Sequence, residues 1–256
     1  MIVLLSGSAN TDLTGLSPWE QNVLNMKQGS AVTYTYSTPE ALRFELHART
    51  AIVEAAKGLY RSGASFAEFK NSRCSPLYWS RTRLGGFQLQ PGVLPSDAVE
   101  DIFRNGRLYA FECAAAIVLV MYKAILDVVG RPVFNTYFQD LVLFTWYLDN
   151  DLRFKRVQLP DVYPGDSLYF NNPDFVPFRP GWRGENTILL EPDLFFAHGP
   201  GILSSGAILA LLNSKRIPGS TTPAHILNDA LCLDFEHIRR LKEGTARIGR
   251  RKFISG

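Results

Sequence analysis

Apolar residues recur with a helical period in several segments of the chain. The first of these segments has one apolar face, which is formed by Leu42, Leu46, Val53, Ala56 and Leu59. Spacings of three, four and seven residues place side chains on one side of an α-helix. Ser37 or Thr38 can cap the start of this helix, Pro39 suits its first turn, and Ser62-Gly63 can end it. The pattern predicts an amphipathic helix over residues 39–62.

A second segment is apolar on every side. Ten consecutive apolar residues run from Cys113 to Tyr122, and the helix-ending residues Gly130 and Pro132 follow. A helix that is apolar all round is buried, and ten residues are too few to span a bilayer. We therefore predict a buried helix over residues 112–129.

Shorter apolar segments between turn residues predict strands. Leu84-Gly85-Gly86 separates two of them, which indicates a hairpin. The predicted strands cover residues 77–82, 87–90, 141–148, 167–170, 187–190 and 194–197. Further helices are predicted over residues 96–104, 204–215 and 223–241. Because the strands cluster between two groups of helices, the order predicts an α+β fold, with the apolar helix packed on a small antiparallel sheet.

The two ends of the chain differ from this pattern. Residues 6–36 mix Ser, Thr, Asn and Gly with scattered apolar positions, which predicts an irregular extension over residues 1–36 that starts with a short strand or a loose arm. Residues 239–252 hold seven basic side chains and one acid, so their charge is 7 − 1 = +6 in a chain of net charge +3. We expect a basic tail over residues 239–256, which is either a solvated end or a docking segment for an acidic surface. One folded domain is then expected over residues 37–238.

Composition excludes several classes of protein. The chain is 46% hydrophobic and 20% charged, which fits a globular protein. Its three cysteines are an odd number without a secretion signal, which argues against a disulfide framework. Its cysteines and histidines show no metal-ligand spacing, so we expect no metal and no cofactor. We also expect no membrane segment, no nucleic-acid partner and no signal peptide.

Cys113 is the first candidate for chemistry, because it stands at the start of the apolar helix. Backbone N–H groups at a helix N-terminus carry partial positive charge and favour a thiolate. A thiolate is a nucleophile for acyl transfer. The alternative is a buried structural cysteine, since free cysteines are among the most buried residues.

The segments after residue 160 suggest a partner for this cysteine. Papain-like enzymes place the nucleophile at a helix N-terminus and the base on a neighbouring sheet. The segment Pro164-Gly165-Asp166 enters a predicted strand, as in cell-wall cysteine peptidases, and the next strand carries Glu185 where such a peptidase has histidine. Glu185 could accept the thiol proton if burial raised its pKa toward neutrality. The alternative is a surface salt bridge between Glu185 and Arg183.

Two more polar residues are candidates for this site. Glu112 precedes the cysteine and could serve as a second base, or could simply stabilise the helix dipole. His198 could orient the acids or balance their charge. The alternative for His198 is a structural histidine near the turns at Gly199 and Gly201.

Four sequence blocks resemble a known family. They cover residues 109–120, 165–172, 182–190 and 196–202. They are similar to the small transglutaminases of Bacillus spore coats, which are protein-glutamine gamma-glutamyltransferases. The combination of Tyr109-Ala110-Phe111-Glu112-Cys113 with Trp182-Arg183-Gly184-Glu185-Asn186 makes the resemblance specific, and it extends from about Ser37 to Asp234.

The resemblance implies a fold and a set of roles. It implies a papain-like core, a catalytic domain over residues 37–238 and a calcium-independent Cys–Glu dyad. Cys113 would be the nucleophile, Glu185 the general base and Glu112 a partly redundant acid. It also implies an aromatic tunnel, whose matching residues are Trp182, Trp146, Tyr169 and Phe66. Each of these four could instead be an ordinary core residue.

The expected activity is protein cross-linking. Protein substrates with accessible Gln and Lys, above all spore coat proteins, would be joined by ε-(γ-glutamyl)lysine bonds. The resemblance implies a location in the spore coat after synthesis in the mother-cell cytoplasm, and we expect a monomer. The alternatives are a papain-like cysteine peptidase or amidase, and a non-catalytic spore coat protein.

Overall fold

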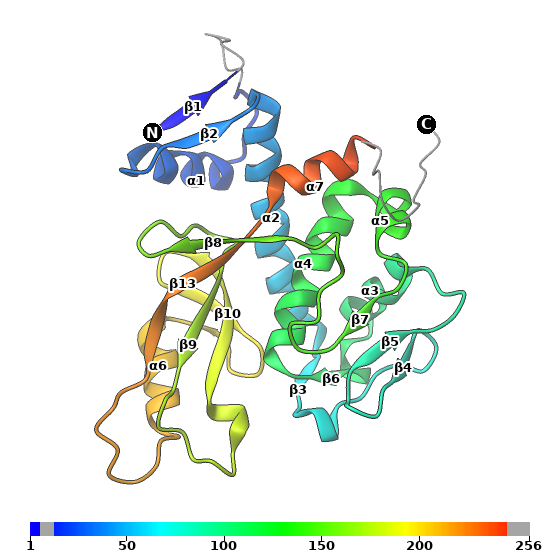
Figure 1. Ribbon diagram of the computed structural model, residues 1–256, viewed down its shortest axis with the longest axis vertical. Helices are drawn as coiled ribbons and strands as arrows, with labels where there is room; N and C mark the ends of the chain where they lie inside the picture. The colour runs from blue at the N-terminus through cyan, green and yellow to red at the C-terminus, as the bar shows by residue number, and fades with distance from the viewer. Residues whose placement is uncertain (6–12, 245–256) are drawn as a thin grey trace.

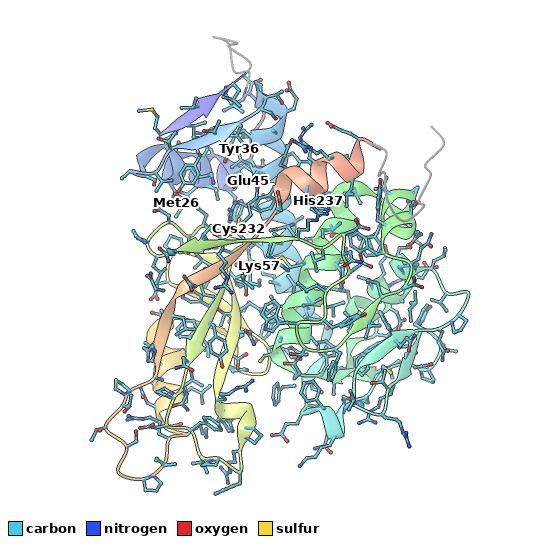
Figure 2. The ribbon with its side chains drawn as sticks, viewed as in Figure 1. Met26, Tyr36, Glu45, Lys57, Cys232 and His237 are labelled. Atoms are coloured by element: carbon cyan, nitrogen blue, oxygen red, sulfur yellow. The ribbon has the colours of Figure 1, made fainter. Side chains whose placement is uncertain are left out.

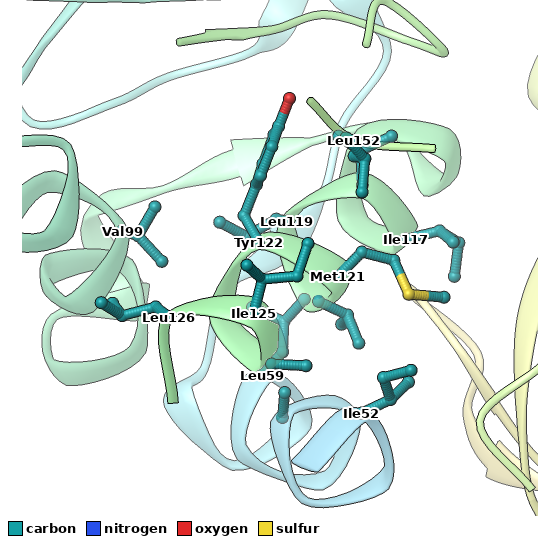
Figure 3. Packing of buried hydrophobic residues seen from close by; sticks show 14 of the residues in the cluster. Ile52, Leu59, Val99, Ile117, Leu119, Met121, Tyr122, Ile125, Leu126 and Leu152 are labelled. Carbon is teal, nitrogen blue, oxygen red and sulfur yellow. The ribbon is translucent and has the colours of Figure 1, made fainter. Parts of the chain in front are cut away.

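Two packed helices and one sheet form the centre of the molecule (Figure 1). The computed structural model describes residues 1–5 and 13–244. Helix α2 (Pro39–Ser62) lies against helix α4 (Cys113–Val129), and both contact strand β10 (Gly184–Glu191). The prediction of a buried apolar helix is confirmed, because every residue from Ala114 to Tyr122 is buried. Figure 3 shows Ile52 and Leu59 of α2 packed toward the side chains of α4.

Local signals in the sequence set the ends of these helices. The Thr38 hydroxyl caps α2 by accepting a hydrogen bond from the Ala41 N–H at 3.3 Å. Gly63 ends α2 in the left-handed conformation, with φ +80°, which glycine adopts without strain. The predictions for 96–104 and 204–215 are also confirmed, as α3 (Pro95–Arg104) and α6 (Ser205–Asn213).

The main sheet has six antiparallel strands in the order β12-β11-β10-β9-β13-β8. The strands are β8 (Phe154–Gln158), β9 (Ser167–Asn171), β10, β11 (Leu194–Ala197), β12 (Gly201–Leu203) and β13 (His225–Leu233). One face packs on α2 and α4 through residues such as Ile188, whereas the other packs on α6 through residues such as Leu189. The expected α+β fold, with the cysteine helix on an antiparallel sheet, is therefore present.

Smaller elements complete the molecule. The predicted hairpin is confirmed, since β4 pairs antiparallel with β5, and β7 adds a third strand. A short parallel pair of strands, β3 and β6, leads into the cysteine helix. These elements are β4 (Trp79–Arg81), β5 (Phe87–Leu89), β7 (Val142–Leu143), β3 (Ser65–Phe66), β6 (Ala110–Phe111), α5 (Arg131–Tyr137) and the 3₁₀ turns η1 (Phe69–Asn71), η2 (Gly106–Leu108) and η3 (Pro180–Trp182).

The prediction of an irregular N-terminal extension is wrong for much of its length. Helix α1 (Pro18–Gly29) begins with a capping box, in which Ser17 and Glu20 exchange hydrogen bonds of 3.2 and 2.8 Å. Strands β1 (Ile2–Leu4) and β2 (Tyr34–Tyr36) pair in parallel, which confirms the short strand expected at the start. The helix has few apolar positions, so its periodicity was weak and its cap was the better signal. The domain division itself stays a prediction.

The prediction of one helix over residues 223–241 is also wrong. The first half of this segment is strand β13, which pairs with β8 and β9 from distant parts of the chain. Helix α7 (Phe235–Lys242) starts only after Asp234, whose carboxylate accepts a hydrogen bond from the His237 N–H at 3.2 Å. This helix crosses the boundary expected at residue 238. The rest of the expected basic tail, residues 245–256, lies outside the described residues.

The aromatic strand expected over residues 141–148 forms only in part. Strand β7 ends at Leu143, and a turn follows in which the Tyr147 N–H donates to the Phe144 carbonyl at 2.8 Å. Thr145, inside this turn, has φ +41°, which is strained for a β-branched residue. The chain leaves the sheet here to form one wall of the groove described next.

Candidate active site

The Cys113 thiol lies at the first turn of α4 and beside a cap formed by its neighbour. The Glu112 carboxylate accepts hydrogen bonds from the N–H groups of Ala114 and Ala115, both at 2.7 Å. It also hydrogen-bonds with the Cys113 thiol. The helix-stabilising role considered for Glu112 is therefore present in the geometry, and its role as a second base stays a prediction.

A groove of about 760 Å³ opens over this helix terminus. Its walls come from four distant parts of the chain: β3 and η1, the turn after β7, β9, and the segment from Pro180 to Asn186. Cys113 and Glu112 both line it. The nucleophile candidate is therefore accessible from solvent although most of α4 is buried.

Asn186 contacts the thiol directly. Its side-chain Nδ2 donates to the Cys113 Sγ at 3.2 Å, and its backbone also hydrogen-bonds with the sulfur. Asn186 is 8% exposed and lines the groove. In the sequence, Asn186 is only the last residue of the block at 182–186, and its position directly after Glu185 was the available signal.

The electrostatics of the site favour a neutral thiol. Burial, the Glu185 carboxyl group and the Glu112 carboxyl group raise the pKa of Cys113 to about 12, whereas the hydrogen bonds from Asn186 lower it. The thiolate expected from the helix N-terminus alone is outweighed, because the nearest N–H donors of the helix are bound to Glu112. The thiol must therefore lose its proton during the reaction.

Glu185 is a buried acid at the start of β10. It is 4% exposed, and its Oε1 has no hydrogen-bond partner among the described residues. Burial, and then the charge of Glu112, raises the pKa of Glu185 well above its ordinary value. Its neighbours Gly184 and Asn186 line the groove, whereas Glu185 lies behind that wall. The burial needed to raise its pKa is present, and Arg183 hydrogen-bonds with Tyr169 instead.

His198 has a different environment from the acids. Its Nε2 lies 3.2 Å from the Ser65 carbonyl oxygen, and its ring stacks on Phe111 at 4.7 Å. Burial lowers the pKa of His198 to about 4, so the ring is neutral. A neutral ring cannot balance the charge of an acid. The geometry therefore favours the structural alternative, in which His198 holds β3 and β6 together beside the cysteine helix.

Three of the four aromatic candidates lie in the groove. Phe66, Trp146 and Tyr169 line it, as the resemblance implied. Trp182 packs instead in the cluster on the α6 face of the sheet, where the Lys215 Nζ lies 5.1 Å from its ring. The core alternative therefore fits Trp182. Phe66 lies between Gly181 and Gly199, where larger residues would crowd its ring.

Neither a candidate metal site nor a candidate membrane-spanning helix is present in the part of the chain that the structure describes. Over residues 1–5 and 13–244, no three side chains of His, Cys, Asp or Glu are grouped so that they could hold a metal ion. Over the same residues, no helix combines the length and hydrophobicity that crossing a bilayer requires. The expectations about metals and membranes stay predictions.

Comparison with known proteins identifies the family. A family model described as "Protein-glutamine gamma-glutamyltransferase" matches residues 1–242. The chain belongs to this family. It is therefore an enzyme of the transferase class, and the blocks at residues 109–113 and 182–186 and the groove can be interpreted as parts of a protein-glutamine gamma-glutamyltransferase.

Named relatives share most of the chain. A protein-glutamine gamma-glutamyltransferase of Halalkalibacterium halodurans is 43% identical over 209 residues, which are 82% of this chain and 74% of the relative. One of Bacillus mycoides is 40% identical over 207 residues, 81% of this chain and 75% of the relative. A solved transglutaminase of Geobacillus stearothermophilus, without its C-terminal extension, is 44% identical with a TM-score of 0.75, and covers 82% of this chain and 98% of its own.

Proposed function

We propose that the chain cross-links proteins by acyl transfer through a thioester on Cys113. The sulfur attacks the side-chain carboxamide carbon of a protein-bound glutamine, and the nitrogen leaves as ammonia. A lysine ε-amine of a second protein then attacks the thioester, forms an ε-(γ-glutamyl)lysine bond and frees the thiol. The observation that carries this proposal is the Cys113 thiol in a groove, under the influence of the half-buried Glu112 carboxyl group and the buried Glu185 carboxyl group.

The two acids suit different proton transfers. Glu112 contacts the thiol, and burial raises its pKa although two N–H donors partly offset that shift, so it is suited to accept the thiol proton. Burial favours Glu185 as a carboxylic acid, which can deliver a proton to the leaving nitrogen. In the second step the amine gives a proton to Glu185, and Glu112 returns one to the sulfur. This assigns the thiol proton to Glu112 and keeps Glu185 as acid and base for nitrogen.

The unpartnered oxygen of Glu185 supports its role toward nitrogen. A buried acceptor without a hydrogen bond costs free energy that a ligand can recover. Both the leaving amide nitrogen and the entering amine carry N–H groups that can donate to such an oxygen. Glu185 raises the pKa of Cys113, which supports a position of its carboxyl group close to the reacting atoms.

The aromatic walls support transfer to an amine over hydrolysis. Phe66, Trp146 and Tyr169 give the groove an apolar lining that fits the hydrocarbon stem of lysine. A site that excludes water protects a reactive thioester from hydrolysis. This lining distinguishes the proposed transferase from an amidase, in which water is the second substrate.

The setting of the activity rests on the resemblance to spore-coat transglutaminases. We propose spore coat proteins with accessible Gln and Lys as substrates, synthesis in the mother-cell cytoplasm, and action as a monomer. We also propose that the enzyme needs no calcium and no cofactor, and that it has no nucleic-acid or membrane partner.

The activity can be tested with a fluorescent primary amine and a glutamine-rich protein. Wild type should attach the amine to the protein and release ammonia, equally with and without EDTA. Cys113→Ala should lose both signals while it keeps its circular dichroism spectrum. Cys74→Ala is the matched control, since the Cys74 thiol only contacts the Trp79 carbonyl oxygen at 3.7 Å. Amine incorporation by folded Cys113→Ala, or strict dependence on calcium, would contradict the proposal.

A further inference from the structure

Cys113 ionises in a site that contains two acids, so its charged form needs hydrogen-bond donors. The carboxyl groups of Glu185 and Glu112 both oppose a negative charge on the sulfur. The donors expected from the helix N-terminus are occupied, because the N–H groups of Ala114 and Ala115 bind the Glu112 oxygens at 2.7 Å. Any stabilisation of a thiolate must therefore come from outside this helix turn.

Asn186 supplies donors to the sulfur from strand β10. Its Nδ2 lies 3.2 Å from the Cys113 Sγ, and its backbone hydrogen-bonds with the same atom. The residue belongs to the central strand β10 and is paired with Tyr169 of β9, so its backbone cannot move freely. Its side chain is almost fully buried at the groove wall. A donor held in this way loses little entropy when charge develops on the sulfur.

We propose that Asn186 is a further catalytic residue, which donates its amide N–H to the Cys113 sulfur as the thiol becomes a thiolate. In a papain-like Cys–His pair the imidazolium offsets this charge. Here the groups that act on the sulfur are the carboxyl groups of Glu185 and Glu112, and Arg183 of the same groove hydrogen-bonds with Tyr169. The neutral carboxamide of Asn186 takes the place of the imidazolium. The same donor stabilises the sulfur again when the thioester breaks and a thiolate leaves.

The test measures ionisation of the thiol without any substrate. The rate of Cys113 alkylation by iodoacetamide is followed from pH 6 to pH 10, with Cys113→Ala subtracting the other cysteines. Asn186→Leu keeps the approximate size and removes both donating N–H groups of the amide. Asn186→Asp keeps the shape but adds a third acid. Hydrogen bonds to charged groups are worth enough to change ionisation by roughly tenfold.

We expect the alkylation rate at a given pH to fall about tenfold in Asn186→Leu and further in Asn186→Asp. Amine incorporation should fall in the same order. The matched control is Thr187→Val, because Thr187 follows Asn186 in strand β10. This variant loses a hydrogen bond of 3.0 Å to the Leu168 carbonyl of β9 but leaves the thiol untouched. Its alkylation profile should equal that of wild type. Asn186→Ala replaces the leucine variant if that one does not fold.

Equal alkylation profiles for wild type, Asn186→Leu and Asn186→Asp would overturn the proposal. An equal loss in Thr187→Val would also overturn it, because the effect would then come from distortion of the strand. The inference rests on Cys113 as the proposed nucleophile, yet the two can fail separately. A shifted profile in an enzyme that incorporates no amine would contradict the proposed function only.

Discussion

Glu112 and Glu185 are the same type of residue in different surroundings. Glu112 receives two backbone N–H groups and contacts the thiol, so its negative charge is partly offset. Glu185 is buried with one oxygen unpartnered, so the neutral form is favoured. The surroundings decide which acid accepts a proton first and which one donates it.

We predict that Glu185→Gln lowers amine incorporation by roughly 10²–10⁴-fold, because the amide can neither donate a proton to ammonia nor accept one from lysine. The ratio is measured as kcat/KM in the fluorescent amine assay. Alkylation of Cys113 should become faster in the same variant, since one opposing acid is gone. Wild-type turnover in Glu185→Gln would remove Glu185 from the mechanism.

The same variant should be more stable than wild type, and increasingly so as the pH rises. The folded state raises the pKa of Glu185 above its ordinary value of 4.5, so folding takes up a proton at higher pH. The contribution of Glu185 to stability is full below pH 4.5 and is lost as the pH rises toward its folded pKa. Melting temperatures of both proteins from pH 5 to pH 8 should diverge. A constant difference would show that Glu185 ionises normally in the folded protein.

Residues at the site could be predicted from the sequence only where local rules decide. Cys113 and Glu112 follow from the helix start, because a cap and a first turn depend on neighbouring residues. The orientation of Trp182 and the contact from Asn186 depend on the register of β10 with β9, which joins residues more than ten positions apart. The chain shows no local sign of the orientation of Trp182, and for Asn186 only its position directly after Glu185.

Among the elements, α2 connects the N-terminal unit with the main sheet. Its Glu45 accepts hydrogen bonds from Lys27 of α1 and from Arg49, both at 2.8 Å, and Arg49 donates to Asp166 at 2.9 Å. Glu45 and Cys232, labelled in Figure 2, lie in this region where α2 passes the strands. Burial alone would raise the pKa of Glu45, but Arg49 and then Lys27 outweigh it and hold the pKa at about 2.

Removal of Asp166 should be costly because it leaves a buried guanidinium short of a partner. Arg49 and Asp166 are 2% and 1% exposed, and breaking a buried ion pair costs roughly 3–5 kcal/mol. We expect Asp166→Ala to lose that amount in urea denaturation. The control Glu54→Ala removes the exposed Lys57–Glu54 pair at 3.2 Å and should lose about 0–1 kcal/mol. Similar losses in both variants would contradict a special role for the buried network.

Helices were easier to predict than strands, because helix boundaries depend on neighbouring residues whereas strand pairing joins residues that are far apart in the chain. The boundaries of α2 and α4 follow from caps and periodicity within each segment. Strand β13 was taken for a helix because its hydrogen bonds go to β8 and β9, which no local pattern reveals. Helix α1 was missed although Ser17 and Glu20 form its capping box, since the segment has few apolar positions.

At the scale of the whole molecule, the groove exists only because distant segments converge on the start of α4. Phe66 comes from β3, Trp146 from the turn after β7, and Tyr169 from β9. These rings enclose the position where the thioester would form. The groove composition was therefore implied by the family resemblance and not by any spacing within the chain.

Trp146 and Trp182, which the resemblance assigned to the same tunnel, lie in different parts of the structure. Trp146 lines the groove and packs edge-on against Phe154, whereas Trp182 lies in the cluster on the α6 face of the sheet. We predict that Trp146→Ala admits water, so the ratio of ammonia released to amine incorporated rises above the wild-type value. Trp182→Ala should lower the melting temperature, because it removes a packed aromatic ring, but should keep the wild-type ratio. Both variants are assayed below their melting temperatures. A raised ratio in Trp182→Ala but not in Trp146→Ala would show that water is excluded at Trp182 and not in the groove. This result would contradict the groove as the path of the amine.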